Sequence, residues 1–258
     1  MNNLTKLAVI SDVHGNLLAL ESALEDIYKK DIRTIINLGD NIYGPLWPEE
    51  TALLFRKHNI IHVLGNEDEI LFNQSPKNPT CQFVLNQISN ETLTWIKSIP
   101  MIYRMANNFV GFHGTANSNH EYLVEKVTGI KGNEIMIKSD EELKTELESI
   151  PENLILCGHS HEPNIIRLSN GKLIINPGSV GLQAYDDDNP FFHRIQNYSP
   201  YARYMILETN GTDFNYELRI LNYDYETAAN LAKKNQRDDW ADWLMTGRAK
   251  GRYYGRFK

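Results

Sequence analysis

Five short segments of the chain carry aspartate, asparagine or histidine within two residues of the end of an apolar run. Their carboxylate, amide and imidazole groups are the groups that bind divalent metal ions in proteins. The seven candidate ligands are Asp12, His14, Asp40, Asn66, His113, His159 and His161. Four of the chain's eight histidines are among them. The sequence therefore predicts a metal site assembled from distant parts of the chain.

The mixture of ligand types indicates which metals would bind there. Oxygen and nitrogen ligands together favour Mn or Fe, and Zn also fits, whereas an all-oxygen set favours Mg or Ca. Seven ligands are too many for one ion, and the two oxygens of Asp40 suit it to bridge a pair. Two ions about 3.5–4 Å apart can hold a bridging hydroxide that attacks phosphorus in line. We therefore expect two divalent metal ions and hydrolysis of a phosphate ester.

Each motif alone also has a purely structural explanation. Asp12-Val13-His14 could form a turn, Gly39-Asp40 could begin a helix, and Gly65-Asn66 could form a left-handed bend. Because five such motifs follow five apolar runs, a shared site is the better interpretation.

The predicted elements explain how these segments could meet. The motifs follow five strand-like runs, at residues 7–10, 35–38, 60–64, 109–112 and 154–157. Helical patterns lie between the first runs, one of them from Glu49 to His58, and residues from about Thr80 to Arg104 are also expected to be helical. This alternation predicts parallel strands, whose carboxyl ends share one edge of a sheet, where ligands bind.

The second half of the chain has a different pattern. Asn170-Gly171 and Asn210-Gly211 each separate two apolar runs, which predicts two β-hairpins. The expected fold is α/β, a four-layer α-β-β-α sandwich of two mixed sheets flanked by helices. We expect one domain over residues 1–258, with a C-terminal helix and basic tail over residues 236–258.

The composition of the chain limits the kinds of partner and the compartment that we expect. The formal charge of -7 argues against a nucleic-acid coat or a membrane-surface protein. Two distant cysteines, Cys81 and Cys157, and the absence of a leader or of about 20 consecutive apolar residues predict a cytoplasmic chain without membrane partners. The expected partner is a small phosphorylated substrate rather than nucleic acid, and a homo-oligomer is left open.

The chain resembles the calcineurin-like metallophosphoesterases over about residues 5 to 245. Five motifs carry the resemblance, namely Asp12-Val13-His14-Gly15-Asn16, Gly39-Asp40, Gly65-Asn66-Glu67-Asp68, His113-Gly114 and Gly158-His159-Ser160-His161. Tyr43-Gly44-Pro45 and the Asn-Pro-Gly-Ser-Val-Gly segment at 176–181 are similar to the small bacterial branch of phosphodiesterases and phosphatases. The resemblance implies the same four-layer fold.

The resemblance also implies how the ligands divide between the metals. One ion would be bound by Asp12, His14, Asp40 and His161, and the other by Asp40, Asn66, His113 and His159. Glu67 stands where the family often has a proton-donating histidine. Burial or nearby carboxylates could raise the pKa of Glu67 and make it the general acid. Alternatively, Glu67 is a spectator and a water supplies the proton.

A second departure from the family is the long segment from Gln183 to Arg194. It could line the substrate pocket, with Arg194 meeting a phosphate and Tyr185 or Phe191 stacking on a base. The alternative is a solvated acidic turn. Asn41 is a further candidate substrate contact, and capping the next turn is its alternative role.

The leading functional hypothesis is a phosphodiesterase or phosphatase that acts on a small phosphorylated metabolite or nucleotide. A dinucleoside polyphosphate hydrolase is the alternative within the same chemistry. A different class is a non-catalytic protein-interaction module on the same fold, as in the retromer subunit that resembles these enzymes and has lost part of its ligand set. The complete ligand set favours the enzyme.

Overall fold

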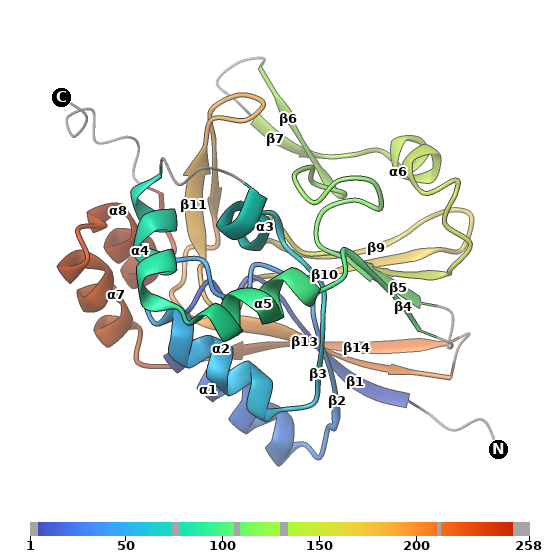
Figure 1. Ribbon diagram of the computed structural model, residues 1–258. Coiled ribbons are helices and arrows are strands. Elements are labelled where there is room, and N and C mark those ends of the chain that lie inside the picture. The colour runs from blue at the N-terminus through green and yellow to red at the C-terminus, as the bar shows by residue number, and fades with distance from the viewer. Residues whose placement is uncertain (1–4, 74–77, 106–108, 130–133, 211–212, 250–258) are drawn as a thin grey trace.

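Two five-stranded sheets pack face to face in the computed structural model, which describes residues 5–73, 78–105, 109–129, 134–210 and 213–249 (Figure 1). The first sheet has the order β14-β13-β1-β2-β3. Its strands are β1 (Thr5–Ile10), β2 (Thr34–Asn37), β3 (Ile60–His62), β13 (Ala202–Thr209) and β14 (Phe214–Leu221). The strands β1, β2 and β3 are parallel to one another, and β13 is antiparallel to both of its neighbours, β1 and β14.

The second sheet has the order β4-β5-β8-β10-β9. Its strands are β4 (Ile102–Met105), β5 (Phe109–Phe112), β8 (Leu154–Leu156), β9 (Pro163–Arg167) and β10 (Leu173–Pro177). The three central strands are parallel and the two edge strands are antiparallel. Both sheets are therefore mixed, as predicted, and the β9–β10 and β13–β14 hairpins are confirmed.

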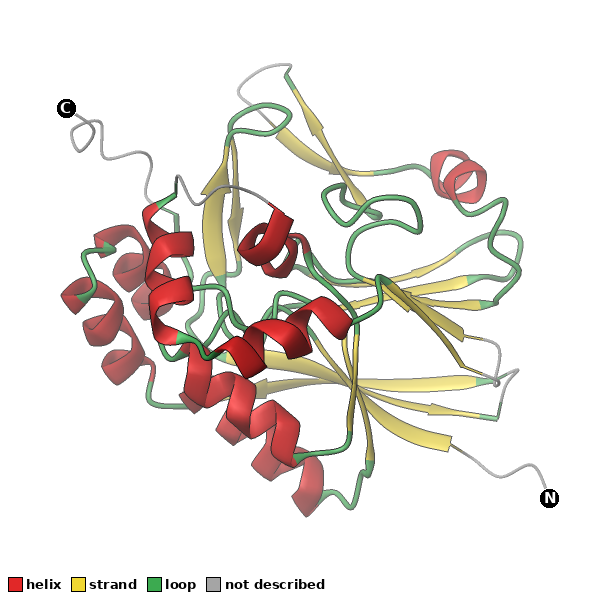
Figure 2. Cartoon of the chain, viewed as in Figure 1, coloured by secondary structure: helices red, strands yellow, loops and turns green. Residues whose placement is uncertain are grey.

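Helices cover the outer face of the first sheet (Figure 2). The helix α1 (Leu17–Lys29) begins at Asn16, whose side chain accepts a hydrogen bond from the backbone of Ala19. Its buried residues recur at helical spacing and join the core beneath the sheet. The neighbouring helices are α2 (Pro48–Lys57), α7 (Tyr225–Lys234) and α8 (Asp238–Thr246).

A shorter helix, α6 (Asp140–Glu146), lies on the outer side of the second sheet, where Leu143 joins the core that covers that face. A third core fills the space between the sheets and includes Leu7, Val9 and Leu156. The predicted four-layer arrangement is thus confirmed. The predicted C-terminal helix corresponds to α8, and residues 250–258 of the predicted tail lie outside the described residues.

The expected helix from Thr80 to Arg104 is wrong in its extent. The segment forms α4 (Pro79–Gln87), α5 (Asn90–Ser98) and then the strand β4. Ser89 interrupts the helix because its extended backbone lets its Oγ accept the Thr92 backbone N–H, 3.1 Å away, as an N-cap. A further helix, α3 (Asn66–Asn73), begins directly at the third motif.

Two small hairpins stand outside the main sheets. One pairs β6 (Glu125–Thr128) with β7 (Glu134–Ile137), and the other pairs β11 (Ala184–Asp187) with β12 (His193–Gln196). The β11–β12 hairpin contains most of the segment from Gln183 to Arg194 that departs from the family pattern. Among the described residues, no helix has the length and apolar character needed to cross a membrane.

Candidate metal centre

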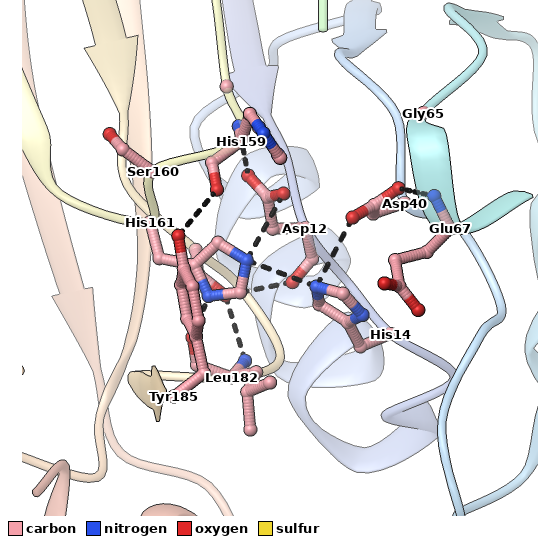
Figure 3. A network of polar contacts seen from close by, with 12 residues as sticks. Asp12, His14, Asp40, Gly65, Glu67, His159, Ser160, His161, Leu182 and Tyr185 are labelled. Carbon is pink, nitrogen blue, oxygen red and sulfur yellow. Dashed lines mark hydrogen bonds and ion pairs between the residues drawn. The ribbon is translucent and has the colours of Figure 1, made fainter. Parts of the chain in front are cut away.

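The seven predicted ligands come together at the carboxyl ends of the parallel strands, as Figure 3 shows for five of them. Their metal-binding atoms form two groups that share Asp40, and the atoms of each group lie within 4.8 Å of one another. The first group is Asp12, His14, Asp40 and His161, and the second is Asp40, His113 and His159. Asn66 completes the second group, because its Oδ1 lies 2.9 Å from Nε2 of His113.

The backbone at these positions is held in an uncommon conformation. Five of the residues have positive φ angles, namely Asp12 (54°), His14 (52°), Asp40 (52°), His159 (70°) and His161 (57°). A side chain disfavours this left-handed region, and such strain persists where the surrounding structure enforces it, often at functional sites. Gly65 illustrates how tight the packing is, since a Cβ there would lie 2.0 Å from Oδ1 of Asp40.

Three histidine rings are oriented by backbone carbonyl groups. Nδ1 of His14 lies 3.0 Å from the carbonyl oxygen of Tyr43, Nδ1 of His113 lies 2.8 Å from that of Leu38, and Nδ1 of His161 lies 2.7 Å from that of Leu182. A carbonyl oxygen can only accept a hydrogen bond, so Nδ1 carries the proton in each neutral ring. Each neutral ring therefore presents an unprotonated Nε2 to the pocket.

The Nε2 atoms of His14 and His161 face other hydrogen-bond acceptors. Nε2 of His14 lies 3.1 Å from Nε2 of His161, and two rings that both carry their proton on Nδ1 have none to place between these atoms. Oδ1 of Asp12 is buried, has no hydrogen-bond partner within the described part of the chain, and lies 3.3 Å from Nε2 of His161. Lone pairs that converge in this way repel one another unless a cation lies between them, so the donor set fits a metal ion.

The pKa values of the site follow from burial and from the two aspartates. Burial lowers the pKa of His14 to about 4 and that of His159 to about 3, which keeps both rings neutral. Burial also acts on His113, but the Asp40 carboxylate outweighs it and raises the pKa of His113 to about 9. Burial alone would raise the pKa of Asp40, yet His113 and its neighbours hold it well below the usual range. A proton on His113 and a bound cation are alternative ways to balance the charge of Asp40.

The two oxygens of Asp40 have different surroundings. Oδ1 accepts a hydrogen bond from the Glu67 backbone N–H at 3.0 Å. Oδ2 lies 3.6 Å from Nε2 of His14 and 3.5 Å from Nε2 of His113. One oxygen of Asp40 therefore faces both groups of ligands.

Glu67, the candidate general acid, is half-buried and lies beside Asp40 (Figure 3). Burial raises the pKa of its carboxyl group to about 8, with further contributions from the charges of Asp40 and Asp187. The side chain can therefore carry a proton near neutral pH, which is the property that the sequence-based hypothesis requires.

The predicted substrate contacts lie in less favourable places. Asn41 is fully buried, and its side-chain amide bonds to Asp68 at 2.6 Å and accepts from Asn37 at 2.7 Å. Arg194 is exposed and lies over the ring of Phe192, whereas the preceding residue His193 is buried. Substrate binding by Asn41 and Arg194 stays a prediction that these positions do not favour.

Tyr185 contacts two of the candidate ligands, His159 and His161. Its ring packs against that of His161 with centroids 4.6 Å apart, and its hydroxyl group donates to the backbone carbonyl of His159 at 3.1 Å. The same hydroxyl lies 2.6 Å from that of Tyr122, which in turn lies 2.8 Å from Nε2 of His193. In this arrangement Tyr185 orients candidate ligands, and its stacking on a base stays a prediction.

Sequence reasoning missed two supporting residues. Asp68 is buried and accepts hydrogen bonds from the backbone N–H groups of Asn41 and Gly65, which fixes the loops that carry Asp40 and Asn66. Asp68 is the last residue of the Gly65-Asn66-Glu67-Asp68 motif, and this place was a signal that could have identified its role. Tyr122 also packs on His159, with ring centroids 4.7 Å apart, but no motif surrounds it.

Comparison with known proteins agrees with this geometry. Residues 5–194 match the family model of the calcineurin-like phosphoesterase superfamily domain. An uncharacterized protein of Methanocaldococcus jannaschii is 28% identical over 267 residues, which cover 94% of this chain and 98% of that protein. Among solved structures, a metallophosphoesterase from Sphaerobacter thermophilus has a TM-score of 0.72 at 23% identity, with 95% of this chain and 100% of that chain covered.

A structure described as a proposed diadenosine tetraphosphatase has a TM-score of 0.52 at 15% identity, over 83% of this chain and 93% of that chain. These two structural matches bear on the fold. The family model covers well over half of the chain, including all seven candidate ligands. The chain therefore belongs to the calcineurin-like phosphoesterase superfamily and is a phosphoester hydrolase.

Proposed function

We propose that the pocket binds two divalent metal ions, Mn or Fe in preference to Zn, and hydrolyses phosphate esters of small metabolites or nucleotides. The observation that carries this proposal is that Nε2 of His14 and Nε2 of His161 lie 3.1 Å apart beside Oδ1 of Asp12, which has no hydrogen-bond partner among the described residues. A second converging set, around His113 and Asn66, supports a second ion.

The residues divide into two binding groups in this proposal. Asp12, His14 and His161 hold one ion, His113, His159 and Asn66 hold the other, and Asp40 contributes to both. Such a pair would supply Lewis-acid polarisation of the phosphoryl oxygens and would lower the pKa of a bound water. Because the ligands are neutral apart from Asp12 and Asp40, a filled pocket keeps a net positive charge that attracts a phosphate anion.

Glu67 would protonate the leaving oxygen. Its backbone is bound to Asp40, which places its side chain beside the shared ligand (Figure 3). A protonated carboxyl in this position can donate its proton to the departing alkoxide and is returned to the acid form by solvent. Tyr185 and Tyr122 would hold the His159–His161 segment in place rather than contact the substrate.

We also propose that the protein works in the reducing cytoplasm. Cys81 and Cys157 are both buried and unpaired, which suits a compartment where thiols stay reduced.

The test combines metal analysis with a panel of esters. The purified protein should contain up to two equivalents of Mn or Fe, chelation should abolish turnover, and Mn²⁺ should restore it. The panel should include p-nitrophenyl phosphate, bis-p-nitrophenyl phosphate and diadenosine tetraphosphate, because these separate phosphatase, phosphodiesterase and dinucleoside polyphosphate hydrolase activities. A protein that binds no metal and hydrolyses none of them would contradict the proposal and favour an interaction module.

A further inference from the structure

The outermost strand of the first sheet, β14, carries a row of apolar side chains at the surface. Tyr216 is 48% exposed, Leu218 is 37% exposed and Ile220 is 52% exposed. Alternate residues of a strand point to the same face, so these three side chains form one continuous row. Large apolar side chains gathered in this way mark an interaction surface more often than isolated ones do.

The row lies on the face of β14 that is turned toward the second sheet. Phe214, two residues before Tyr216, packs against the core between the sheets. The residues between them point to the opposite face, toward the helices. Arg219, for example, forms an ion pair with Asp26 of α1 at 3.0 Å. The apolar row therefore continues the inner face of the sandwich beyond the place where the second sheet covers it.

The neighbouring edge of the second sheet adds to the same surface. β10 packs against β13, and these strands adjoin β9 and β14 respectively, so the two edge strands lie on the same side of the sandwich. Ile165 of β9 is 37% exposed, and the next residue, Ile166, packs on the opposite, outer face. On the open side of the sandwich the second sheet thus adds the apolar Ile165, with the exposed Arg167 two positions along the same face.

β14 also has an open backbone edge. It pairs with β13 on one side, and the described part of the chain supplies no strand on its other side. Edge strands are commonly protected by being short or by carrying proline or lysine. β14 is eight residues long, and its sequence FNYELRIL contains neither. Its free N–H and C=O groups can therefore accept another strand.

We infer that β14 pairs in antiparallel fashion with β14 of a second copy of this chain, about a twofold axis at Leu218. In this register Leu218 lies opposite itself and Tyr216 lies opposite Ile220, so the apolar rows meet. Glu217 lies opposite Arg219 on the other face, twice across the axis. The two first sheets then form one continuous sheet, and the contact is isologous, as most homodimer contacts are.

The charged residues of β14 favour a twofold axis at residue 218 over an axis at residue 217 or 219. A twofold axis at residue 217 would place Glu217 opposite its own copy, and an axis at residue 219 would place Arg219 opposite its own copy. Like charges directly opposite each other destabilise an antiparallel pair, whereas opposite charges stabilise it. The strand is thus complementary to itself at Leu218, which identifies a second copy as the partner.

Cross-linking tests the register directly. Opposite Cα atoms in an antiparallel pair are about 4.5–5.5 Å apart, within the range of about 4.4–6.8 Å that a disulfide spans. Leu218→Cys should therefore give a covalent dimer on mild oxidation. Ile220→Cys is the matched control, because the two residues 220 would lie about 13 Å apart at ~3.3 Å per residue. The native cysteines are buried and should give little background.

Sedimentation equilibrium tests the association itself. The wild-type protein should dimerise at micromolar to hundred-micromolar concentration, and Leu218→Lys should raise the dissociation constant more than about tenfold by placing two lysines face to face. Glu217→Arg should weaken the dimer in the same direction, whereas Glu50→Arg, the same charge change on the distant helix α2, should not. Thermal melting of each variant would show that it is folded.

The possible outcomes are decisive. A wild-type monomer at hundred-micromolar concentration overturns the inference, as does a dimer that Leu218→Lys leaves intact. Equal cross-linking of Leu218→Cys and Ile220→Cys would contradict the register. None of these measurements depends on the phosphoesterase activity, so the inference and the proposed function are tested separately.

Discussion

Oδ1 of Asp40 accepts a hydrogen bond from the backbone N–H of Glu67 at 3.0 Å, and this contact leaves Oδ2 facing both groups of candidate ligands. The sequence suggested that Asp40 would bridge with one oxygen for each ion. The structure instead has one oxygen oriented by the backbone and the other directed to both His14 and His113. This hydrogen bond links Asp40 to Glu67, so a substitution of either residue should affect the position of the other.

Replacing Asp40 by asparagine should remove both metals. The amide keeps the size of the side chain but removes the charge that both ions would share. Since even residues that only orient metal ligands contribute about 10–100-fold to metal affinity or activity, turnover should fall more than about a hundredfold. Metal content by mass spectrometry and turnover of a nitrophenyl ester measure both effects.

Asp31→Asn is the matched control for this change. Asp31 is exposed and, like Asp40, has a left-handed backbone, with φ of 57°. It should keep full metal content and activity. If Asp40→Asn retained two metals, the assignment of Asp40 as the shared ligand would be wrong.

Single histidine substitutions should empty the two sites separately. His113→Ala should deplete the ion bound near Asn66, and His14→Ala should deplete the ion bound near Asp12, because each ring belongs to one group. Titration of the metal-free variants with Mn²⁺ by calorimetry should show one strong site in each case. His62→Ala is the control, since His62 bonds to Asn41 outside both groups. Equal loss of both ions in the two variants would argue against two separate binding groups.

The pH dependence of turnover should report on Glu67. Its pKa is raised to about 8, so the acid form predominates below that pH and is lost as pH rises through it. Turnover limited by proton donation should therefore decline on the alkaline side. A cation bound at Asp40 cancels part of the repulsion that raises this pKa, which places the decline no higher than about pH 8.

Glu67→Gln removes the proton donor while preserving the shape of the side chain. General acid catalysis contributes about 10²–10⁴-fold, so turnover should fall by that order and the alkaline decline should disappear. An ester with a nitrophenolate leaving group needs little protonation and should be much less affected than an alkyl ester. An unchanged profile with unchanged turnover would show that Glu67 is a spectator.

Tyr185→Phe should weaken the support of the ligands without emptying the site. It removes the hydroxyl that binds the His159 carbonyl and the Tyr122 hydroxyl, but keeps the ring against His161. The expected cost is about 1 kcal/mol of unfolding free energy and a several-fold loss of metal affinity. Chemical denaturation and metal titration would measure the two. A change in KM alone, with unchanged metal affinity, would instead indicate direct substrate contact.

The sequence predicted the parts of the site that depend on strand ends. The candidate ligand His113 directly follows β5, Asp12 lies two residues after the end of β1, and parallel strands must bring their carboxyl ends to one edge. Asn41 could not be placed in this way, because its direction is set by Asp68, which lies 27 positions later in the chain. Local periodicity carries no information about such a contact.

Hairpins could be predicted from the sequence only where the turn residues determine the geometry. The Asn-Gly hairpins were predictable because the turn residues themselves determine the geometry. The β11–β12 hairpin lacks that signal, and its strands of four residues are too short to show a clear alternation. Its place over the ligands depends on contacts of Tyr185 and His193 with Tyr122, which only the folded chain reveals.

The most direct test is an anomalous-scattering map from crystals grown with Mn²⁺. Two peaks are expected, one among Asp12, His14 and His161 and the other among Asn66, His113 and His159, with Asp40 adjacent to both. A map with no peak in this pocket, or with peaks only at other residues, would contradict a metal centre built from these seven side chains.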